Sequence, residues 1–278
     1  MWSLTEVITD CPLINVVDIG AAIGEEPSYQ KLIDAGKARL IGFEPNEKEC
    51  AELNRRYGPP HRFFPYFLGD GKPGTFHETV WALTGSLFEP NKALNEKFQN
   101  LAEPTQLVAR HPVNTTRLDD VPDLGDIDFI KIDVQGAELM IFENAPQSLA
   151  KAIAIQTEVE FVSHYIDQPL FADVDIALRG AGFQFHTFMG FGSRAFKPLA
   201  KAHDRNEGFR QFIWSDAVYV RDWMRLADIP TEKLKKYAVL MHDIFGSYDL
   251  AHAVIDEIDR RESGRLGERY RERLIGKA

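Results

Sequence analysis

The sequence predicts an α/β fold with a mostly parallel sheet, an antiparallel last strand and a C-terminal helical hairpin. Short β-rich runs alternate with helical patterns as far as about Val220, which is typical of βαβ units and a parallel sheet. The last two β-rich runs have no clear helix between them, and this favours an antiparallel final strand.

Each element follows from the same alternation. The predicted strands cover residues 15–19, 39–43, 62–68, 129–132, 152–158, 183–188 and 212–220. The predicted helices between them cover residues 27–35, 46–57, 137–143 and 171–181. Asn46 is expected to cap the second helix, with Glu49 three residues later. The region 69–117 departs from this rhythm and predicts a β-rich insertion or lid over the strand ends.

The character of the chain changes after Val220. Two helices are predicted from apolar residues on one face, at Leu234, Ala238, Met241 and Phe245 and then at Leu250, Val254, Ile255 and Ile258. Charged residues dominate from Asp259 on, so we expect a frayed tail. We predict a main domain over residues 1–222 and a helical extension over 223–278. The hairpin is expected to pack on the main domain, and a homodimer through these helices is the alternative.

Composition excludes several classes of protein. The 278 residues carry a net charge of -10, which argues against general nucleic-acid binding because that needs a cationic surface. No apolar run reaches the ~20 residues of a membrane helix. The N-terminal segment lacks the pattern of a signal peptide, so a cytoplasmic location is expected. Cys11 and Cys50 form no disulfide or metal pattern.

The first strand ends in VVDIGAAIG, which predicts a cofactor loop containing Asp18, Gly20, Ala22 and Gly24. Glycine there lets the backbone approach a ligand closely. Ala22 stands where the fingerprint for NAD has its second glycine, so the loop suits a pyrophosphate poorly. A cofactor whose amino-acid part packs on the Gly20 turn fits better, and a plain tight turn is the alternative.

The second strand ends in GFEPN and adds Glu44 and Pro45 to the same site. Glu44 lies where an acidic residue accepts hydrogen bonds from both ribose hydroxyls of an adenosine cofactor. Asp70, in FLGDGKPG, has two equal interpretations. It either caps a turn or reaches the adenine amine.

The stretch FIKIDVQGAE, residues 129–138, reads as a buried strand that ends in a carboxylate, followed by a glycine turn and a helix. Ligands of open α/β sheets bind at the carboxyl ends of the strands. With VVDIGAAIGEE, GFEPN, TTRLDD and TEVEF, this stretch resembles S-adenosylmethionine-dependent methyltransferases of the FkbM type. The resemblance covers about residues 14–220.

That resemblance implies a Rossmann-like class I methyltransferase fold, with S-adenosylmethionine held by Asp18, Gly20 and Glu44. It also implies methyl transfer to a hydroxyl of a sugar, glycan or other secondary metabolite. A catalytically silent module with this fold is an alternative function. An NAD-dependent oxidoreductase is another, and the missing glycines speak against it.

The candidate catalytic residues are Asp133, Glu158 and His164, since a positioned carboxylate or imidazole can remove the hydroxyl proton. Asp133 and Glu158 are expected to converge because their strands are neighbours. Three roles stay open for these carboxylates: a general base, a divalent-cation site, or a structural brace. In the brace, Glu138 caps its helix and Asp133 accepts hydrogen bonds from backbone amides of the VQGAE turn. No third metal ligand is evident at a familiar spacing. The basic stretch 190–210 suggests an anionic acceptor, with a solvated arm as the alternative.

Overall fold

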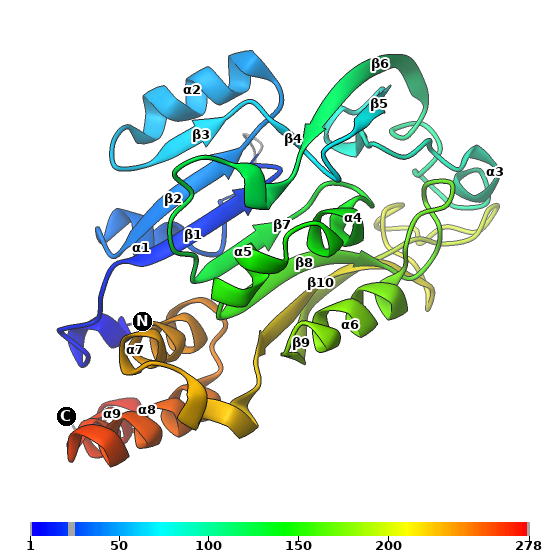
Figure 1. Cartoon of the computed structure of the whole chain (residues 1–278). Coiled ribbons are helices and arrows are strands. Elements are labelled where there is room, and N and C mark those ends of the chain that lie inside the picture. Colours follow the sequence, from blue (N-terminus) through cyan, green and yellow to red (C-terminus); the bar gives the residue numbers. More distant parts are fainter. Residues whose placement is uncertain (1, 22–25, 277–278) are drawn as a thin grey trace.

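A computed structural model describes residues 2–21 and 26–276, and its main feature is a seven-stranded sheet (Figure 1). The strand order is β3-β2-β1-β7-β8-β10-β9. Its strands are β1 (Ile14–Ile19), β2 (Ala38–Phe43), β3 (Arg62–Phe64), β7 (Phe129–Ile132), β8 (Ala154–Glu160), β9 (Phe183–Ser193) and β10 (Phe212–Arg221). Every pairing is parallel except those of β10, which is antiparallel to both β8 and β9. The predicted parallel sheet with an antiparallel last strand is therefore confirmed.

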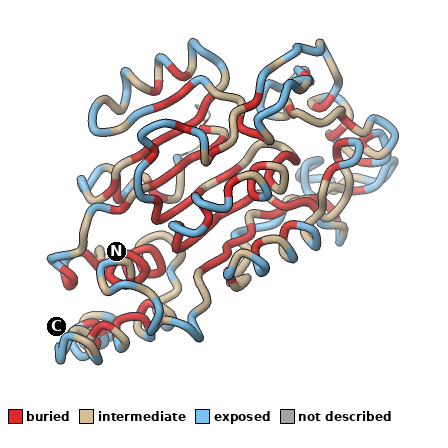
Figure 2. The backbone as a smooth tube through the Cα atoms, in the orientation of Figure 1, coloured by how far each residue is buried: buried red, intermediate tan, exposed pale blue. Residues whose placement is uncertain are grey.

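Helices cover both faces of this sheet, so its strands are apolar on both sides (Figure 2). Consecutive strand residues point to opposite faces. Val16 and Phe129 join one hydrophobic cluster, with the N-terminal segment and the C-terminal helices. Val17 and Ile130 join a second cluster, with the helices that flank β8.

The α-helices are α1 (Gln30–Asp34), α2 (Glu47–Tyr57), α3 (Lys92–Asn95), α4 (Glu138–Glu143), α5 (Pro146–Lys151), α6 (Phe171–Gly180), α7 (Thr231–Val239), α8 (Tyr248–Glu262) and α9 (Leu266–Leu274). Short 3₁₀ turns lie at Leu4–Glu6, Ala82–Thr84, Leu118–Asp120 and Trp223–Asp228, and a π-helical segment lies at Leu240–Ile244. Asn46 caps α2 as predicted, accepting hydrogen bonds from the backbone N–H groups of Lys48 and Glu49. Helix α5, which opens on a proline, was not predicted.

The region 69–117 is β-rich, as predicted, and forms a second sheet beside the first together with the two residues before it (Figure 1). Its strands are β4 (Phe67–Leu68), β5 (Pro73–Thr79) and β6 (Leu107–Thr116), in the order β4-β6-β5. The predicted single strand over 62–68 is wrong. Its first half is β3 and its second half is β4 of the other sheet, and Pro65, which has no backbone N–H to donate, lies between them.

The C-terminal helices belong to the hydrophobic cluster on one face of the main sheet, with α8 packed on α7 and α9 on α8 (Figure 1). Residues 234–242 are all buried, so α7 is covered on every side after its first turn (Figure 2). Leu234, Met241 and Val254 are fully buried within the chain, which confirms packing on the main domain for this face. The predicted frayed tail is wrong, because α9 forms and buries Tyr270. The boundary after residue 222 follows the end of β10 and stays a prediction as a domain boundary.

Buried ion pairs fix α7 to the end of the sheet opposite the candidate site. Asp128, which precedes β7, is fully buried and lies 2.6 Å from Lys233 Nζ and 2.8 Å from Lys236 Nζ. Its Oδ2 also accepts a hydrogen bond from the backbone N–H of Asn15. Removing one partner of such a buried pair leaves an uncompensated charge. Among the described residues, no helix is long and apolar enough to cross a membrane.

Candidate functional site

Three neighbouring parallel strands, β1, β2 and β7, end in one row, and the fourth, β8, continues past it to Glu160. Ile19 is in register with both Phe43 and Ile132, and Ile132 is in register with Thr157. The next residue on each strand is Glu44, Gly20, Asp133 or Glu158. The two predicted halves of the site, cofactor loop and carboxylates, are therefore adjacent along one edge of the sheet.

Gly20 makes the turn that leaves β1. Its φ of +84° lies in the left-handed region that favours glycine. A Cβ at this position would lie 2.0 Å from the backbone oxygen of Asp133. The N–H groups of Gly20 and Ala21 both donate to the carbonyl of Phe43 at 3.1 Å. The loops after β1, β2 and β7 are therefore in direct contact. Ala22 and Gly24 lie outside the described residues.

Asp18 is buried near the end of β1 and has one carboxylate oxygen without a hydrogen-bond donor. Its Oδ2 accepts a hydrogen bond from the hydroxyl of Tyr29. Its Oδ1 is buried and has no hydrogen-bond partner, and the nearest cation, Lys131 Nζ, is 3.9 Å away. Burial raises the pKa of Asp18, and the Lys131 charge opposes this rise. An unpaired buried acceptor suits a ligand that brings a donor.

Glu44 is buried at the end of β2, and Pro45 follows it, half-buried. Glu44 Oε1 accepts a hydrogen bond of 2.7 Å from the N–H of Asn46, which fixes the side chain in its loop. Burial raises the pKa of this carboxyl group.

Asp70 takes part in a turn. Its carboxylate accepts hydrogen bonds from the backbone N–H of Lys72 at 3.0 Å and from Lys72 Nζ at 2.9 Å. These contacts agree with the interpretation that Asp70 caps a turn. The adenine contact stays a prediction.

Asp133 and Glu158 converge on one side-chain amide. Gln135 Nε2 donates to Asp133 Oδ1 at 2.8 Å and to Glu158 Oε2 at 2.7 Å. Glu138 lies beside them, and its Oε1 accepts a hydrogen bond of 2.8 Å from the N–H of Val134. Ligand atoms of these three acids all lie within 4.8 Å of one another. Glu138 thus braces the turn, and the other two carboxylates share one donor.

Gln135 is the residue that sequence reasoning missed. Its φ of +58° is rare for a side chain other than glycine. Its Oε1 accepts a hydrogen bond from the hydroxyl of Tyr165 at 3.1 Å, and its backbone oxygen accepts one from Ser86 Oγ at 2.7 Å. Strained residues of this kind gather at functional sites. Its place two residues after Asp133 in the motif was the available signal.

Three acids around this turn, Glu138, Glu158 and Glu160, have raised pKa values. Burial is the main cause at Glu158, followed by the charge of Asp133, and the pKa lies well above its ordinary value. Glu160 is raised in the same way, by burial and then by the charge of Glu138. Burial raises the pKa of Glu138 to about 7. Lys131 Nζ, 4.0 Å from Asp133 Oδ2, is a nearby positive charge.

His164 lies apart from this group of carboxylates. Its ring packs edge-on against Trp214, with centroids 5.9 Å apart, and its Nε2 is buried without a partner. Burial, with the charge of Arg194, lowers the pKa of the imidazole to about 4. The structure therefore brings together two of the three predicted catalytic residues, Asp133 and Glu158.

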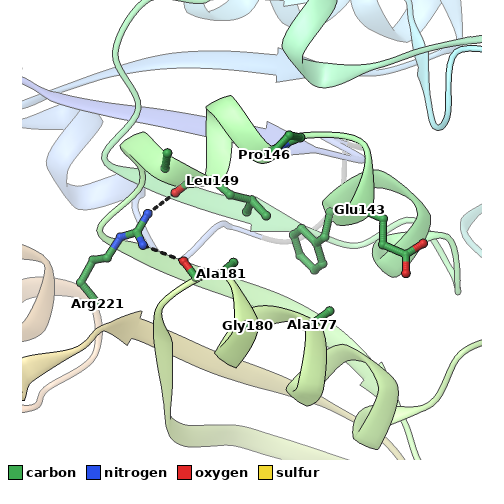
Figure 3. Close-up of a pocket in the computed structure, with 9 residues that line it drawn as sticks. Glu143, Pro146, Leu149, Ala177, Gly180, Ala181 and Arg221 are labelled. Carbon is green, nitrogen blue, oxygen red and sulfur yellow. Dashed lines mark hydrogen bonds between the residues drawn. The ribbon is translucent and has the colours of Figure 1, made fainter.

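A separate hollow of about 410 Å³ lies between α5 and α6 and is mostly apolar (Figure 3). The guanidinium of Arg221 at its edge donates to the backbone oxygens of Leu149, Ala152 and Ala181. These carbonyls lie at helix ends, where cationic side chains commonly satisfy them. The contacts of Arg221 are structural, and the hollow lies outside the row of strand ends.

The raised pKa of Glu138 predicts a pH-dependent stability. The folded state holds this proton more tightly than the unfolded state, so the contribution is complete below pH about 4.5 and is lost as pH rises through about 7. The full change corresponds to about 3 kcal/mol. Glu138→Gln mimics the neutral acid. Between about pH 5 and about pH 8, its free energy of unfolding should fall by about 2–3 kcal/mol less than that of wild type. Urea unfolding across this range measures the difference.

The matched control for that prediction is Glu143→Gln, because Glu143 is exposed on the same helix, α4. It should follow the wild-type pH profile. Parallel profiles for wild type and Glu138→Gln would mean that the Glu138 proton does not contribute to stability.

Comparison with known proteins gives a family match over more than half of the chain, which includes Gly20, Glu44, Asp133 and Glu158. The family model described as "Methyltransferase FkbM domain" matches residues 18–185. The "2-O-methyltransferase NoeI" of Sinorhizobium fredii (strain NBRC 101917 / NGR234) is 31% identical over 170 residues. That match covers 56% of this chain and 65% of NoeI, so the chain spans less than two thirds of this relative.

Similarity to solved structures is weak. A putative methyltransferase from Thermoplasma acidophilum aligns with a TM-score of 0.39 and 7% identity, over 76% of this chain and 69% of that one. The 16S rRNA (adenine(1408)-N(1))-methyltransferase from Catenulisporales acidiphilia aligns with a TM-score of 0.33 and 10% identity, over 79% of this chain and 94% of that one. The fold assignment rests on strand order and direction.

Proposed function

The chain belongs to the FkbM methyltransferase domain family, and on that premise we propose that it transfers the methyl group of S-adenosylmethionine to a hydroxyl oxygen. Its sheet has the strand order of the class I methyltransferase fold, with β10 antiparallel. The observation that carries the proposal is the single row formed by Gly20, Glu44, Asp133 and Glu158. The acceptor is a small molecule or glycan, and the name of NoeI, a 2-O-methyltransferase, supports oxygen as the nucleophile.

The residues present fit this cofactor. The unpaired Oδ1 of Asp18 can accept a hydrogen bond from the ammonium group of an amino acid. Glu44 is held at the adjacent strand end, where a carboxylate can accept two hydrogen bonds from a ribose diol. We assign Gly20, Ala22, Gly24 and Pro45 to the loops around it and Asp70 to its periphery. When bound, S-adenosylmethionine supplies an electrophilic methyl group on a sulfonium.

The chain's own contribution is to orient the acceptor hydroxyl and take its proton. Alignment of nucleophile and methyl group supplies much of the rate gain in such displacements. We assign proton removal to the Asp133–Glu158 pair, and within it to Glu158, since its raised pKa makes this carboxylate a stronger base than usual. Gln135 positions both. His164 is left out of this role because its ring packs on Trp214.

A divalent cation is the alternative use of the three acids, since Glu138 supplies the third ligand that the sequence did not reveal. The amide nitrogen of Gln135 donates to both Asp133 and Glu158. It therefore supplies the positive end of a dipole between the two carboxylates, as a cation would. We favour the metal-free pair for this reason.

Cofactor binding by Glu44 is testable without knowing the acceptor. S-adenosylhomocysteine should raise the melting temperature of the wild-type protein, because ligand bound to the folded state stabilises it. Glu44→Ala should weaken its affinity about 10- to 100-fold, which is the loss of one or two charge-assisted hydrogen bonds. Isothermal titration calorimetry measures the affinity, and Glu47→Ala, exposed in the first turn of α2, is the matched control.

Three results would separate the candidate functions. Absence of any melting shift in the wild type would contradict S-adenosylmethionine as the cofactor. A shift with nicotinamide dinucleotides instead would favour an oxidoreductase. A shift with S-adenosylhomocysteine, but no transfer of labelled methyl to a panel of glycans and small alcohols, would favour a silent binding module.

A further inference from the structure

A second surface of this protein lies between β9 and β10. We call residues 189–212 the arm; it includes the last strand residues of β9 and the first of β10. Six of its large apolar side chains are exposed: Met189, Phe191, Phe196, Leu199, Phe209 and Phe212. The exposed fractions of Phe196, Leu199 and Phe209 are 54%, 66% and 57%. Exposed apolar side chains concentrated in one short segment are typical of an interaction site.

Contacts within the arm and with the body of the protein hold these side chains in place. The ring of Phe191 stacks on Phe212 with centroids 4.3 Å apart, and that of Phe196 lies 4.4 Å from Phe98. Gln99 Nε2 donates to the backbone oxygen of Leu199 at 3.1 Å. The exposed apolar groups therefore belong to a segment tied to the body of the protein.

The arm is basic although the protein is acidic. It contains five lysine and arginine residues against two acidic ones, in a chain of net charge -10. Lys201 and His203 pair with Glu207. Lys197, Arg205 and Arg210 are exposed and take part in no ion pair between described residues. Unpaired cations beside exposed rings select an anionic partner.

The apolar surface continues beyond the arm. Phe196 also lines a mostly apolar hollow of about 460 Å³, together with Leu94, Phe98 and Val162. The N–H of Phe161, directly after β8, donates to the backbone oxygen of Ile213 at 2.8 Å. The start of β10, directly after the arm, is therefore hydrogen-bonded to the chain at the end of β8.

We propose that the arm docks the protein on an anionic lipid bilayer. Aromatic rings have an apolar body that enters the headgroup region, and cations beside them are attracted to anionic headgroups. A second copy of the chain fits this surface less well, because a two-fold interface would bring the unpaired cations of both copies together. The proposal needs no membrane-spanning helix and does not depend on methyl transfer.

The test is vesicle binding by the full chain. Wild type should cosediment with phosphatidylcholine vesicles that contain phosphatidylglycerol, should bind pure phosphatidylcholine at least about tenfold more weakly, and should be released by salt. The double variant Lys197→Glu with Leu199→Ser should lose at least about tenfold in affinity, since each cation near the surface contributes about fivefold. Both positions are exposed, so the melting temperature should stay near that of wild type.

The matched control is Lys31→Glu with Ile176→Ser, which changes an exposed lysine on α1 and an exposed isoleucine on α6. It should bind vesicles like wild type. Equal binding to both vesicle types, binding to neither, or equal loss in the two double variants would each overturn the proposal. So would a wild-type dimer in light scattering that becomes monomeric in the arm variant. None of these results bears on binding of S-adenosylhomocysteine.

Discussion

Replacing Gly20 with alanine should destabilise the protein by about 2–5 kcal/mol. Alanine in the left-handed region costs about 1–2 kcal/mol, and forcing a methyl group against packed atoms adds about 1–3 kcal/mol. Both terms apply, since φ is +84° and the new Cβ would lie 2.0 Å from the backbone oxygen of Asp133. Relief of that contact requires the loop after β7 to move. Urea unfolding measures the loss of stability, and calorimetry should show a parallel loss of S-adenosylhomocysteine affinity.

Gly36 offers a matched control within the same chain. Its φ is +64°, and a Cβ there would meet nothing within 4 Å. Gly36→Ala should therefore cost only the backbone strain, about 1–2 kcal/mol, and should leave the affinity unchanged. Equal losses in the two variants would show that the contact with Asp133 does not matter.

Replacing Glu158 with glutamine should lower kcat about 100- to 10,000-fold, which is the usual contribution of a general base. The affinity for S-adenosylhomocysteine should stay within a few-fold of wild type. The active form of Glu158 is deprotonated, and burial and the charge of Asp133 raise its pKa, so wild-type kcat/KM should increase as pH rises through that raised value. Glu158→Gln should lose this dependence. Methyl transfer to an identified acceptor, with and without a chelator, is the measurement.

Glu160→Gln is the control for that experiment, because Glu160 is a buried acid on the same strand with a raised pKa. It should retain activity within about tenfold, since Glu160 lies outside the group of mutually close acids formed by Asp133, Glu138 and Glu158. Equal losses at both positions would indicate a general effect of buried charge. Loss of wild-type activity on chelation would favour the cation site over the metal-free pair.

The main sheet could be predicted from the sequence because its strands are short apolar runs separated by clear turn and cap signals. Asn46 and Gly182 are examples of such local signals. The predicted elements were wrong or missing where the local sequence signals for a strand or helix were interrupted. Pro65 divides a run that reads as one strand, and α5 covers residues 146–151, between the helix predicted over 137–143 and the strand predicted from 152, which were assigned to no element. Helix α9 is highly charged, and its burial of Tyr270 depends on contacts with residues far along the chain.

The row of strand ends could be predicted because parallel strands in register place consecutive loops at one edge. The role of Glu138 beside Asp133 and Glu158 could not. It depends on the positive φ values of Gln135 and Gly136, which fold the chain back on itself. The position of the His164 ring likewise depends on Trp214, which lies fifty residues later in the sequence.

The close packing of Gly20 against Asp133 has a thermodynamic consequence for the binding of two ligands at the site. The Gly20 turn, which would bind the cofactor, packs directly against Asp133, which would contact the acceptor. No methyl group fits between them. A ligand that moves either loop must move the other. Binding at the two half-sites is then linked, and by reciprocity each ligand alters the affinity for the other by the same factor.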